Sequence, residues 1–180
     1  AAILKSLCEK NILKIEERKV SRLGEDKAGE QQANPLSLQQ ESAIKQIRDY
    51  FTSKDCVLLR GVTSSGKTEV YIHLIREYIS RGKQVLYMLP EIALTVQIIR
   101  RLRRVFGDTI GIYHSGMPDN IRAELWKKQS GPKPYPVILG VRSSLFLPFQ
   151  KLGLVIVDEE HDPSYKQKEP APRYHGRDAA

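Results

Sequence analysis

Residues 61–68 read Gly-Val-Thr-Ser-Ser-Gly-Lys-Thr, which matches the pattern G-x-x-x-x-G-K-[ST] of a phosphate-binding loop. The segment lies between a short apolar stretch at 56–59 and an amphipathic stretch that begins near Lys67. Small residues let backbone N–H groups converge on phosphate oxygens, and a helix N-terminus adds partial positive charge. The sequence therefore predicts a nucleotide phosphate site, with an ordinary glycine turn before a helix as the simpler alternative.

The residue types in this loop predict how the phosphates are held. Lys67 would reach the β- and γ-phosphates of a nucleoside triphosphate, where its charge is needed. The hydroxyl of Thr68 would ligate Mg²⁺, a hard cation that prefers oxygen ligands and bridges phosphates. The other loop residues expected to contact the phosphates are Gly61, Thr63, Ser64, Ser65 and Gly66.

Outward from this loop, short apolar runs alternate with amphipathic helical stretches. This alternation is typical of an α/β fold in which helices cover a mostly parallel sheet. Ser37 is expected to cap the helix before the loop, with Gln40 completing a capping box. Strands are predicted at residues 56–59, 85–89, 109–113, 137–140 and 154–157.

A cluster of acidic residues follows the last predicted strand. The apolar run 154–157 delivers Asp158-Glu159-Glu160-His161 to the carboxyl end of that strand, where ligands bind in open α/β sheets. Asp158 is expected to hold Mg²⁺ through water, and Glu159 to orient or deprotonate the water that attacks the γ-phosphate. Glu160 and His161 would then sense the outcome of this attack on the γ-phosphate. A solvated acidic turn is the alternative.

Composition limits the class of protein. The 180 residues carry 29 lysines and arginines against 21 acidic residues, a net charge of +8 that permits a polyanionic partner without proving one. The only cysteines, Cys8 and Cys56, lack metal-ligand spacing, which excludes a disulfide framework and a zinc cluster within this chain. The longest aliphatic run, 154–157, is far shorter than the roughly 20 residues of a membrane span. A cytoplasmic protein without membrane contact is expected.

An acidic box of this kind after a phosphate loop resembles the DEAD/DEAH-type superfamily 2 helicases, and among them the replication-restart DNA helicases. The likeness runs from about Leu36 to the end of the chain. It is carried by Gly61-Val-Thr-Ser-Ser-Gly-Lys-Thr-Glu-Val-Tyr71, Leu89-Pro-Glu-Ile-Ala-Leu-Thr95 with Gln97, His114-Ser-Gly116, Gly140-Val-Arg-Ser-Ser-Leu-Phe146 with Pro148, Val157-Asp-Glu-Glu-His-Asp162, Ser164-Tyr-Lys-Gln-Lys168 and Arg173-Tyr-His-Gly-Arg-Asp178.

The resemblance also implies a domain organisation. Residues 36–180 would form the first RecA-like P-loop NTPase lobe of a helicase. Residues 1–22 resemble the last helix and wing strand of a winged-helix domain, and the polar residues 23–35 would be a linker. The chain ends before the third helicase motif, whose strand usually lies between the phosphate-loop strand and the acidic-box strand, so the completeness of the sheet stays open.

For function, the resemblance implies ATP hydrolysis, with ATP and Mg²⁺ as cofactors, coupled to translocation and unwinding at stalled replication forks. Expected partners are single-stranded and forked DNA and other primosome and replication-restart proteins, in the bacterial cytoplasm at the nucleoid. The family also binds zinc, but its ligands are absent from this chain. Because the arginine finger is also missing, the chain alone is expected to hydrolyse ATP poorly. A P-loop phosphotransferase and a non-catalytic single-stranded DNA-binding module remain alternatives.

Several site residues follow from the resemblance. Gln40 would contact adenine, although its place in a capping box is a competing role. Hydroxyls, arginines and loop amides grip a DNA backbone, and aromatic rings stack on bases. Val141 and Ser64 depart from the family, which usually has threonine and glycine there. The residues expected to contact DNA are Thr95, Arg142, Ser143, Ser144, Tyr165, Lys166, Lys168, Arg173 and Tyr174.

Overall fold

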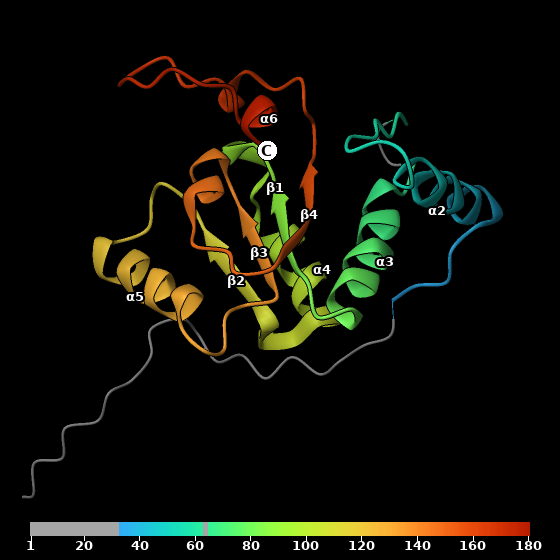
Figure 1. The fold of residues 1–180 in the computed structure, drawn as a ribbon, viewed down its shortest axis with the longest axis horizontal. Coiled ribbons are helices and arrows are strands. Elements are labelled where there is room, and N and C mark those ends of the chain that lie inside the picture. The colour runs from blue at the N-terminus through green and yellow to red at the C-terminus, as the bar shows by residue number, and fades with distance from the viewer. Residues whose placement is uncertain (1–32, 63–64) are drawn as a thin grey trace, which may run out of the picture.

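The computed structural model describes residues 33–62 and 65–180. Its centre is a sheet of four strands in the order β2-β3-β1-β4, and every neighbouring pair is parallel (Figure 1). The winged-helix piece expected at 1–22, most of the linker, and Thr63 and Ser64 lie outside the described residues. The strands are β1 Gln84–Met88, β2 Ile110–Tyr113, β3 Val137–Gly140 and β4 Leu152–Val157.

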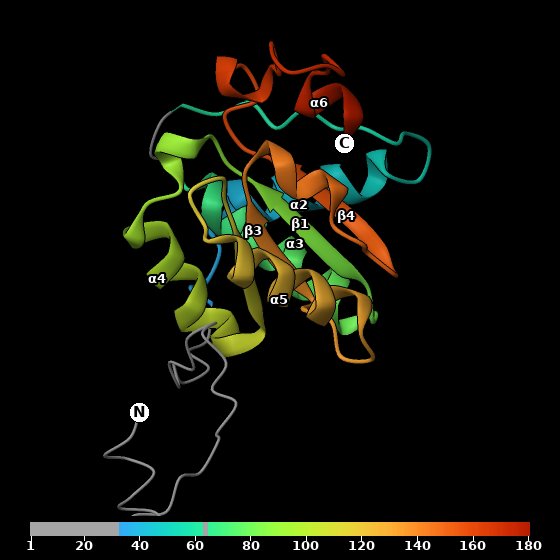
Figure 2. The same ribbon diagram turned by 90° about the vertical axis from the view of Figure 1, so that its left-hand side faces the viewer.

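Helices cover both faces of this sheet, which confirms the predicted α/β fold. The helices α3 and α4 pack on one face, where α2 packs against α3, and α5 packs on the other face (Figures 1 and 2). The short helix α6 lies beyond the carboxyl ends of the strands in both views. No helix among the described residues has the length and apolar character needed to cross a membrane. The helices are α2 Leu38–Tyr50, α3 Lys67–Ser80, α4 Val96–Phe106, α5 Asp119–Ser130 and α6 Gly176–Ala179.

The local signals explain these elements. The inner strand β1 is buried along its whole length because both faces of a parallel sheet are covered, so its sequence is nearly continuous in apolar residues. The capping box predicted at the start of α2 is present: the Ser37 hydroxyl accepts from the Gln40 amide, and the Gln40 side chain accepts from the Ser37 amide. Gly82, with φ of 69°, follows the end of α3 in the left-handed conformation that suits glycine.

The prediction of a strand at residues 56–59 is wrong. Within the described residues, this segment is not paired with any strand, and Leu58 keeps 66% of its surface exposed. A strand forms only where a neighbour offers matching N–H and C=O groups. By the resemblance, residues 56–59 and β4 would be separated by one further strand. The four described strands pair only with one another, so the apolar run has no ladder to join.

A buried amide side chain, that of Gln84, connects neighbouring strands at the amino-terminal end of the sheet. The Gln84 side chain donates from Nε2 to the Tyr135 carbonyl at 3.0 Å. Its Oε1 accepts from the backbone amides of Gln150 at 2.8 Å and Lys151 at 2.9 Å. Gln84 is only 5% exposed, so these bonds are shielded from water. This one side chain therefore links the segments that lead into β3 and β4 to the start of β1.

Replacing Gln84 by leucine should lower the free energy of unfolding by about 2–4 kcal/mol, because buried backbone donors and an acceptor lose their partners. Urea unfolding followed by circular dichroism measures the change. Gln46→Leu is the matched control, since Gln46 is exposed on α2 and should shift stability by less than about 0.5 kcal/mol. Equal stability of the Gln84 and Gln46 variants would contradict the role of this network.

Candidate functional site

The phosphate loop and the acidic box meet at the carboxyl edge of the sheet. The Lys67 ammonium, at the start of α3, lies 3.8 Å from Oε1 of Glu159, which follows β4. The same ammonium donates to the Gly61 carbonyl at 2.9 Å. Lys67 thus connects the first residue of the loop with the acidic box. The structure brings together the two segments that the sequence analysis assigns to one nucleotide site.

The loop is held from outside by Gln40. Its Nε2 donates to the Gly66 carbonyl at 3.1 Å, while its Oε1 accepts from the Ser37 amide. Gly66 has φ of 81°, and a Cβ there would approach Nε2 of Gln40 to 2.3 Å, so glycine is required. Ser65 folds over Gly61, where a Cβ would meet its hydroxyl at 2.7 Å. Gln40 therefore braces the loop, and its contact with adenine stays a prediction.

The carboxylate of Asp158 is fixed at both oxygens. The Tyr87 phenol donates to Oδ2 at 2.9 Å, and the Glu159 amide donates to Oδ1 at 3.1 Å. Burial raises the pKa of Asp158 above its usual value, and the neighbouring charge of Glu159 adds to this, whereas the Tyr87 hydrogen bond opposes it. A half-buried carboxylate in these surroundings is stabilised as an anion by a nearby cation.

Glu159 adopts an uncommon backbone conformation. Its φ is 47°, in the left-handed region that non-glycine residues rarely occupy. Its carboxylate lies between Lys67 and His161, with Oε2 3.8 Å from Nε2 of His161. Strained backbone of this kind is concentrated at functional sites, because the surrounding structure must hold it. The turn thereby aims the Glu159 side chain at the phosphate-loop lysine.

Of the last two residues of the acidic box, Glu160 contacts the helix α6 and His161 is exposed. Oε2 of Glu160 accepts from Nη1 of Arg177 at 2.8 Å, and Arg177 also pairs with Asp178 at 3.0 Å. His161 keeps 76% of its side chain exposed. Glu160 is therefore linked to α6. Its role in sensing the state of the nucleotide site stays a prediction.

The oxygens near this site suit magnesium. Thr68 offers a half-buried hydroxyl at the start of α3, and Asp158 offers a carboxylate at the end of β4. Magnesium usually takes one or two protein ligands and completes its coordination with water and phosphate oxygens. The described residues contain no group of three or more His, Cys, Asp and Glu side chains that could hold a metal without such additional ligands. The donor set thus fits a phosphate-bound magnesium ion.

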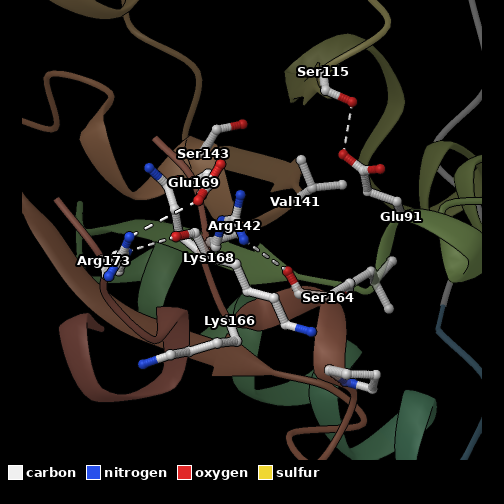
Figure 3. Close-up of a pocket in the computed structure, with 13 residues that line it drawn as sticks. Glu91, Ser115, Val141, Arg142, Ser143, Ser164, Lys166, Lys168, Glu169 and Arg173 are labelled. Atoms are coloured by element: carbon white, nitrogen blue, oxygen red, sulfur yellow. Dashed lines mark hydrogen bonds and ion pairs between the residues drawn. The ribbon is translucent and has the colours of Figure 1, made fainter. Parts of the chain in front are cut away.

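Beside the acidic box, an open groove of about 1070 Å³ collects many of the residues expected to contact DNA (Figure 3). Its wall is held in place by Arg142, whose Nη1 donates to the Ser164 carbonyl at 3.2 Å. On the opposite wall the Ser115 hydroxyl donates to Glu91 at 2.6 Å. The predicted DNA-contacting residues that line the groove are Arg142, Ser143, Lys166, Lys168 and Arg173.

Two other predicted contacts are buried. Ser144 is 0% exposed, and its hydroxyl donates to the carbonyl of Val141, the residue that precedes the turn of residues 142–146. Tyr165 is also 0% exposed, and its phenol donates to the backbone carbonyl of Asp158 at 2.7 Å. Neither side chain reaches the groove surface, because each satisfies a buried carbonyl. This corrects the expectation that they touch DNA directly.

Thr95 and Tyr174 lie outside the groove lining. The Thr95 hydroxyl accepts from the Ile98 amide and so caps α4, although the residue is exposed. The Tyr174 ring packs edge to face against Phe146 at 5.3 Å, with the Arg142 guanidinium 5.6 Å from its centre. Tyr174 therefore adds an aromatic surface next to Arg142 of the groove.

Two residues of this region were not anticipated from the sequence. Phe146 lies in an apolar run, yet 58% of its surface is exposed beside Tyr174. Tyr87 lies in the apolar run of β1 and is buried, yet its hydroxyl contacts Asp158. The only available signal was a tyrosine in an otherwise aliphatic strand, since a buried phenol needs a hydrogen-bond partner.

Comparisons with known proteins agree with this geometry. Residues 37–177 match the family described as DEAD/DEAH box helicase. The chain is 37% identical over 184 residues to the replication restart protein PriA of Bacillus subtilis (strain 168), which covers 100% of this chain and 23% of that protein.

Two further relatives carry the same name. The replication restart protein PriA of Synechocystis sp. is 38% identical over 181 residues, or 100% of this chain and 22% of that protein. That of Rickettsia conorii is 46% identical over 145 residues, or 81% of this chain and 22% of that protein. The chain spans less than a quarter of the length of these relatives.

Proposed function

The chain belongs to the DEAD/DEAH box helicase family, and we propose that it is the ATP-binding lobe of a replication-restart DNA helicase. Its site would bind ATP with magnesium, and its groove would hold part of a single DNA strand. The whole protein would couple ATP hydrolysis to translocation and unwinding at stalled forks, in the bacterial cytoplasm at the nucleoid, and would act with other primosome proteins. The parallel sheet flanked by helices is consistent with a RecA-like helicase lobe.

The proposal rests above all on the approach of Lys67 to Glu159, 3.8 Å apart. In ATP hydrolysis, charge on the γ-phosphoryl group must be stabilised while a water molecule attacks in line. Lys67 would leave the Gly61 carbonyl for the β- and γ-phosphates. Glu159 would then be free to orient or deprotonate the attacking water. Since 3.8 Å leaves no room for a phosphoryl group, the two side chains would move apart when ATP binds, with Lys67 on the phosphate and Glu159 on the water.

Asp158 and Thr68 would hold the magnesium ion, with Asp158 acting through water. Bound magnesium supplies positive charge to the phosphate oxygens. Asp158 is well suited because its carboxylate is already oriented by Tyr87 and by the Glu159 amide. Gln40 would support the loop through the Gly66 carbonyl, and the adenine contact is proposed for the same side chain.

The groove would hold the DNA backbone without reading its sequence. Lys166, Lys168 and Arg173 supply positive charge along one wall, and Ser143 adds a hydroxyl. Contacts of this type bind phosphate and leave the bases unread. Phe146 and Tyr174 lie outside the groove lining, but the Tyr174 ring adjoins Arg142 of the groove, so the pair offers ring surfaces on which a base can stack.

Coupling between groove and nucleotide site would run through the backbone that follows the acidic box. Ser164 and Lys166 line the groove, whereas Tyr165 between them bonds to the Asp158 carbonyl at 2.7 Å. On the other side, Glu160 is paired with Arg177. A DNA strand in the groove would therefore contact a segment that is hydrogen-bonded to Asp158, the proposed magnesium ligand.

Phosphate release by the intact protein, with and without single-stranded or forked DNA, tests the function. DNA-stimulated hydrolysis is expected. Turnover of a small phosphoryl acceptor without stimulation by DNA would instead indicate a phosphotransferase. DNA binding that is indifferent to ATP and to Lys67 would indicate a non-catalytic binding module.

Replacing both Lys166 and Lys168 by alanine should weaken single-stranded DNA binding equally for all sequences. The slope of log K against log salt concentration should become shallower by about 0.7 per lysine, because fewer counterions are released. Fluorescence anisotropy at several salt concentrations measures this slope. The control replaces Lys127 and Lys133, which are exposed on α5 and in the loop after it. An equal change in the control variant would place the strand elsewhere.

A further inference from the structure

Tyr87 occupies an unusual position for a hydroxyl group. It lies in β1, paired with Leu139 of β3 and Ile156 of β4, and is 0% exposed. The other buried residues of the strand include Val85, Leu86 and Met88, which have only apolar side chains. An aliphatic residue would fill such a site without a polar group to satisfy. The hydroxyl of Tyr87 is therefore not explained by packing alone.

The Tyr87 hydroxyl has one described use, which is to donate to Oδ2 of Asp158 at 2.9 Å. The ring is held in place by Tyr71 of α3, which packs against it edge to face at 5.6 Å. Both flanking strands are also hydrogen-bonded to β1. The donor is thus rigid, because neither the ring nor its backbone can move without disturbing the core.

With Tyr87 on one oxygen and the Glu159 amide on the other, the Asp158 carboxylate is held at two points. A carboxylate fixed at both oxygens cannot rotate freely about its side-chain bonds. Each oxygen still has a lone pair available for a further donor, such as a metal-bound water. Two other tyrosines lie near Asp158. The Tyr165 hydroxyl bonds to the backbone carbonyl of Asp158, whereas burial and the nearby Asp158 carboxylate raise the pKa of the Tyr71 phenol. Among the described hydrogen bonds, the tyrosine that donates to the carboxylate is Tyr87.

We propose that Tyr87 is a positioning residue that orients the Asp158 carboxylate toward magnesium. This inference rests on the proposed function, in which Asp158 holds the ion. Groups that hydrogen-bond to a metal ligand fix its orientation, and their loss typically lowers metal affinity or activity by about 10- to 100-fold. Tyr87, which is buried, acts through its hydrogen bond to Asp158.

The test is Tyr87→Phe in the intact protein, which removes only the hydroxyl. A fluorescent ATP analogue is bound at increasing Mg²⁺ concentrations, and the concentration giving half-maximal binding is measured. We expect that concentration to rise by about 10-fold or more. Binding of the analogue in excess EDTA should be unchanged. The control is Tyr78→Phe, since Tyr78 lies on α3 against Arg81 and not against the acidic box.

Asp158→Asn and the double variant complete a mutant cycle. If Tyr87 acts through Asp158, adding Tyr87→Phe to Asp158→Asn should change the Mg²⁺ requirement by less than about twofold. The same change in both backgrounds would mean a general structural effect and would overturn the inference. If Asp158→Asn raises the Mg²⁺ requirement but Tyr87→Phe leaves it unchanged, the inference about Tyr87 is overturned and the proposed magnesium site stands. If Asp158→Asn itself matches the unmodified protein, the proposed magnesium site fails, and the inference fails with it.

Discussion

Replacing Lys67 by alanine should lower the rate of ATP hydrolysis by the intact protein by about 10²- to 10³-fold, the range found when one charge-stabilising group is removed from an active site. The Lys67 ammonium starts α3 and lies close to both the Gly61 carbonyl and Glu159. It therefore lies between the phosphate loop and the acidic box, where the γ-phosphate is expected. Phosphate release under saturating ATP and DNA measures the change.

The control for this prediction is Lys133→Ala, which removes an exposed lysine from the loop after α5. DNA binding should be retained in both variants, because Lys67 does not line the groove. If Lys67→Ala lost less than about tenfold in turnover, the loop would not stabilise the transferred phosphoryl group as proposed.

Replacing Glu159 by glutamine should lower hydrolysis by about 10²- to 10⁴-fold, which is the usual contribution of a general base. Glutamine keeps the size and the left-handed backbone of this residue, whose φ is 47°, but it cannot accept a proton. Binding of ATP with magnesium should persist, because Asp158 and Thr68 are unchanged. Single-turnover hydrolysis together with a separate nucleotide-binding titration distinguishes these steps.

Glu41→Gln is a suitable partner variant, because Glu41 is exposed in the first turn of α2 and should leave the rate within about twofold. Equal loss of nucleotide binding and hydrolysis in Glu159→Gln would assign Glu159 to binding. Unchanged ATP hydrolysis in Glu159→Gln would show that Glu159 is not the general base.

The meeting of Lys67 with the acidic box could be anticipated because both motifs are local and each follows from its neighbours in the chain. A glycine-rich loop precedes a helix, a charged turn follows an apolar strand, and both belong at the carboxyl edge of a parallel sheet. The strands 85–89, 137–140 and 154–157 were also predictable, since each is a bounded apolar run. The structure confirms them with shifts at their ends.

What escaped prediction depends on distant partners. Residues 56–59 have the composition of a strand, but pairing requires a neighbour that sequence alone does not locate. Ser144 and Tyr165 have side chains suited to DNA, yet each turns inward to a carbonyl in its own fold. Tyr87 was hidden for the opposite reason, since burial made it resemble core and only its contact with Asp158 revealed a polar role.

The left-handed turn at Glu159 sets two selective pressures against each other. A conformation of this kind costs about 1–3 kcal/mol in a non-glycine residue, which glycine would largely recover. A library screened only for thermal tolerance should therefore drift toward glycine at this position. One screened for turnover should keep glutamate despite its instability. At this position of the acidic box, the residue that favours stability and the residue that favours hydrolysis are therefore different.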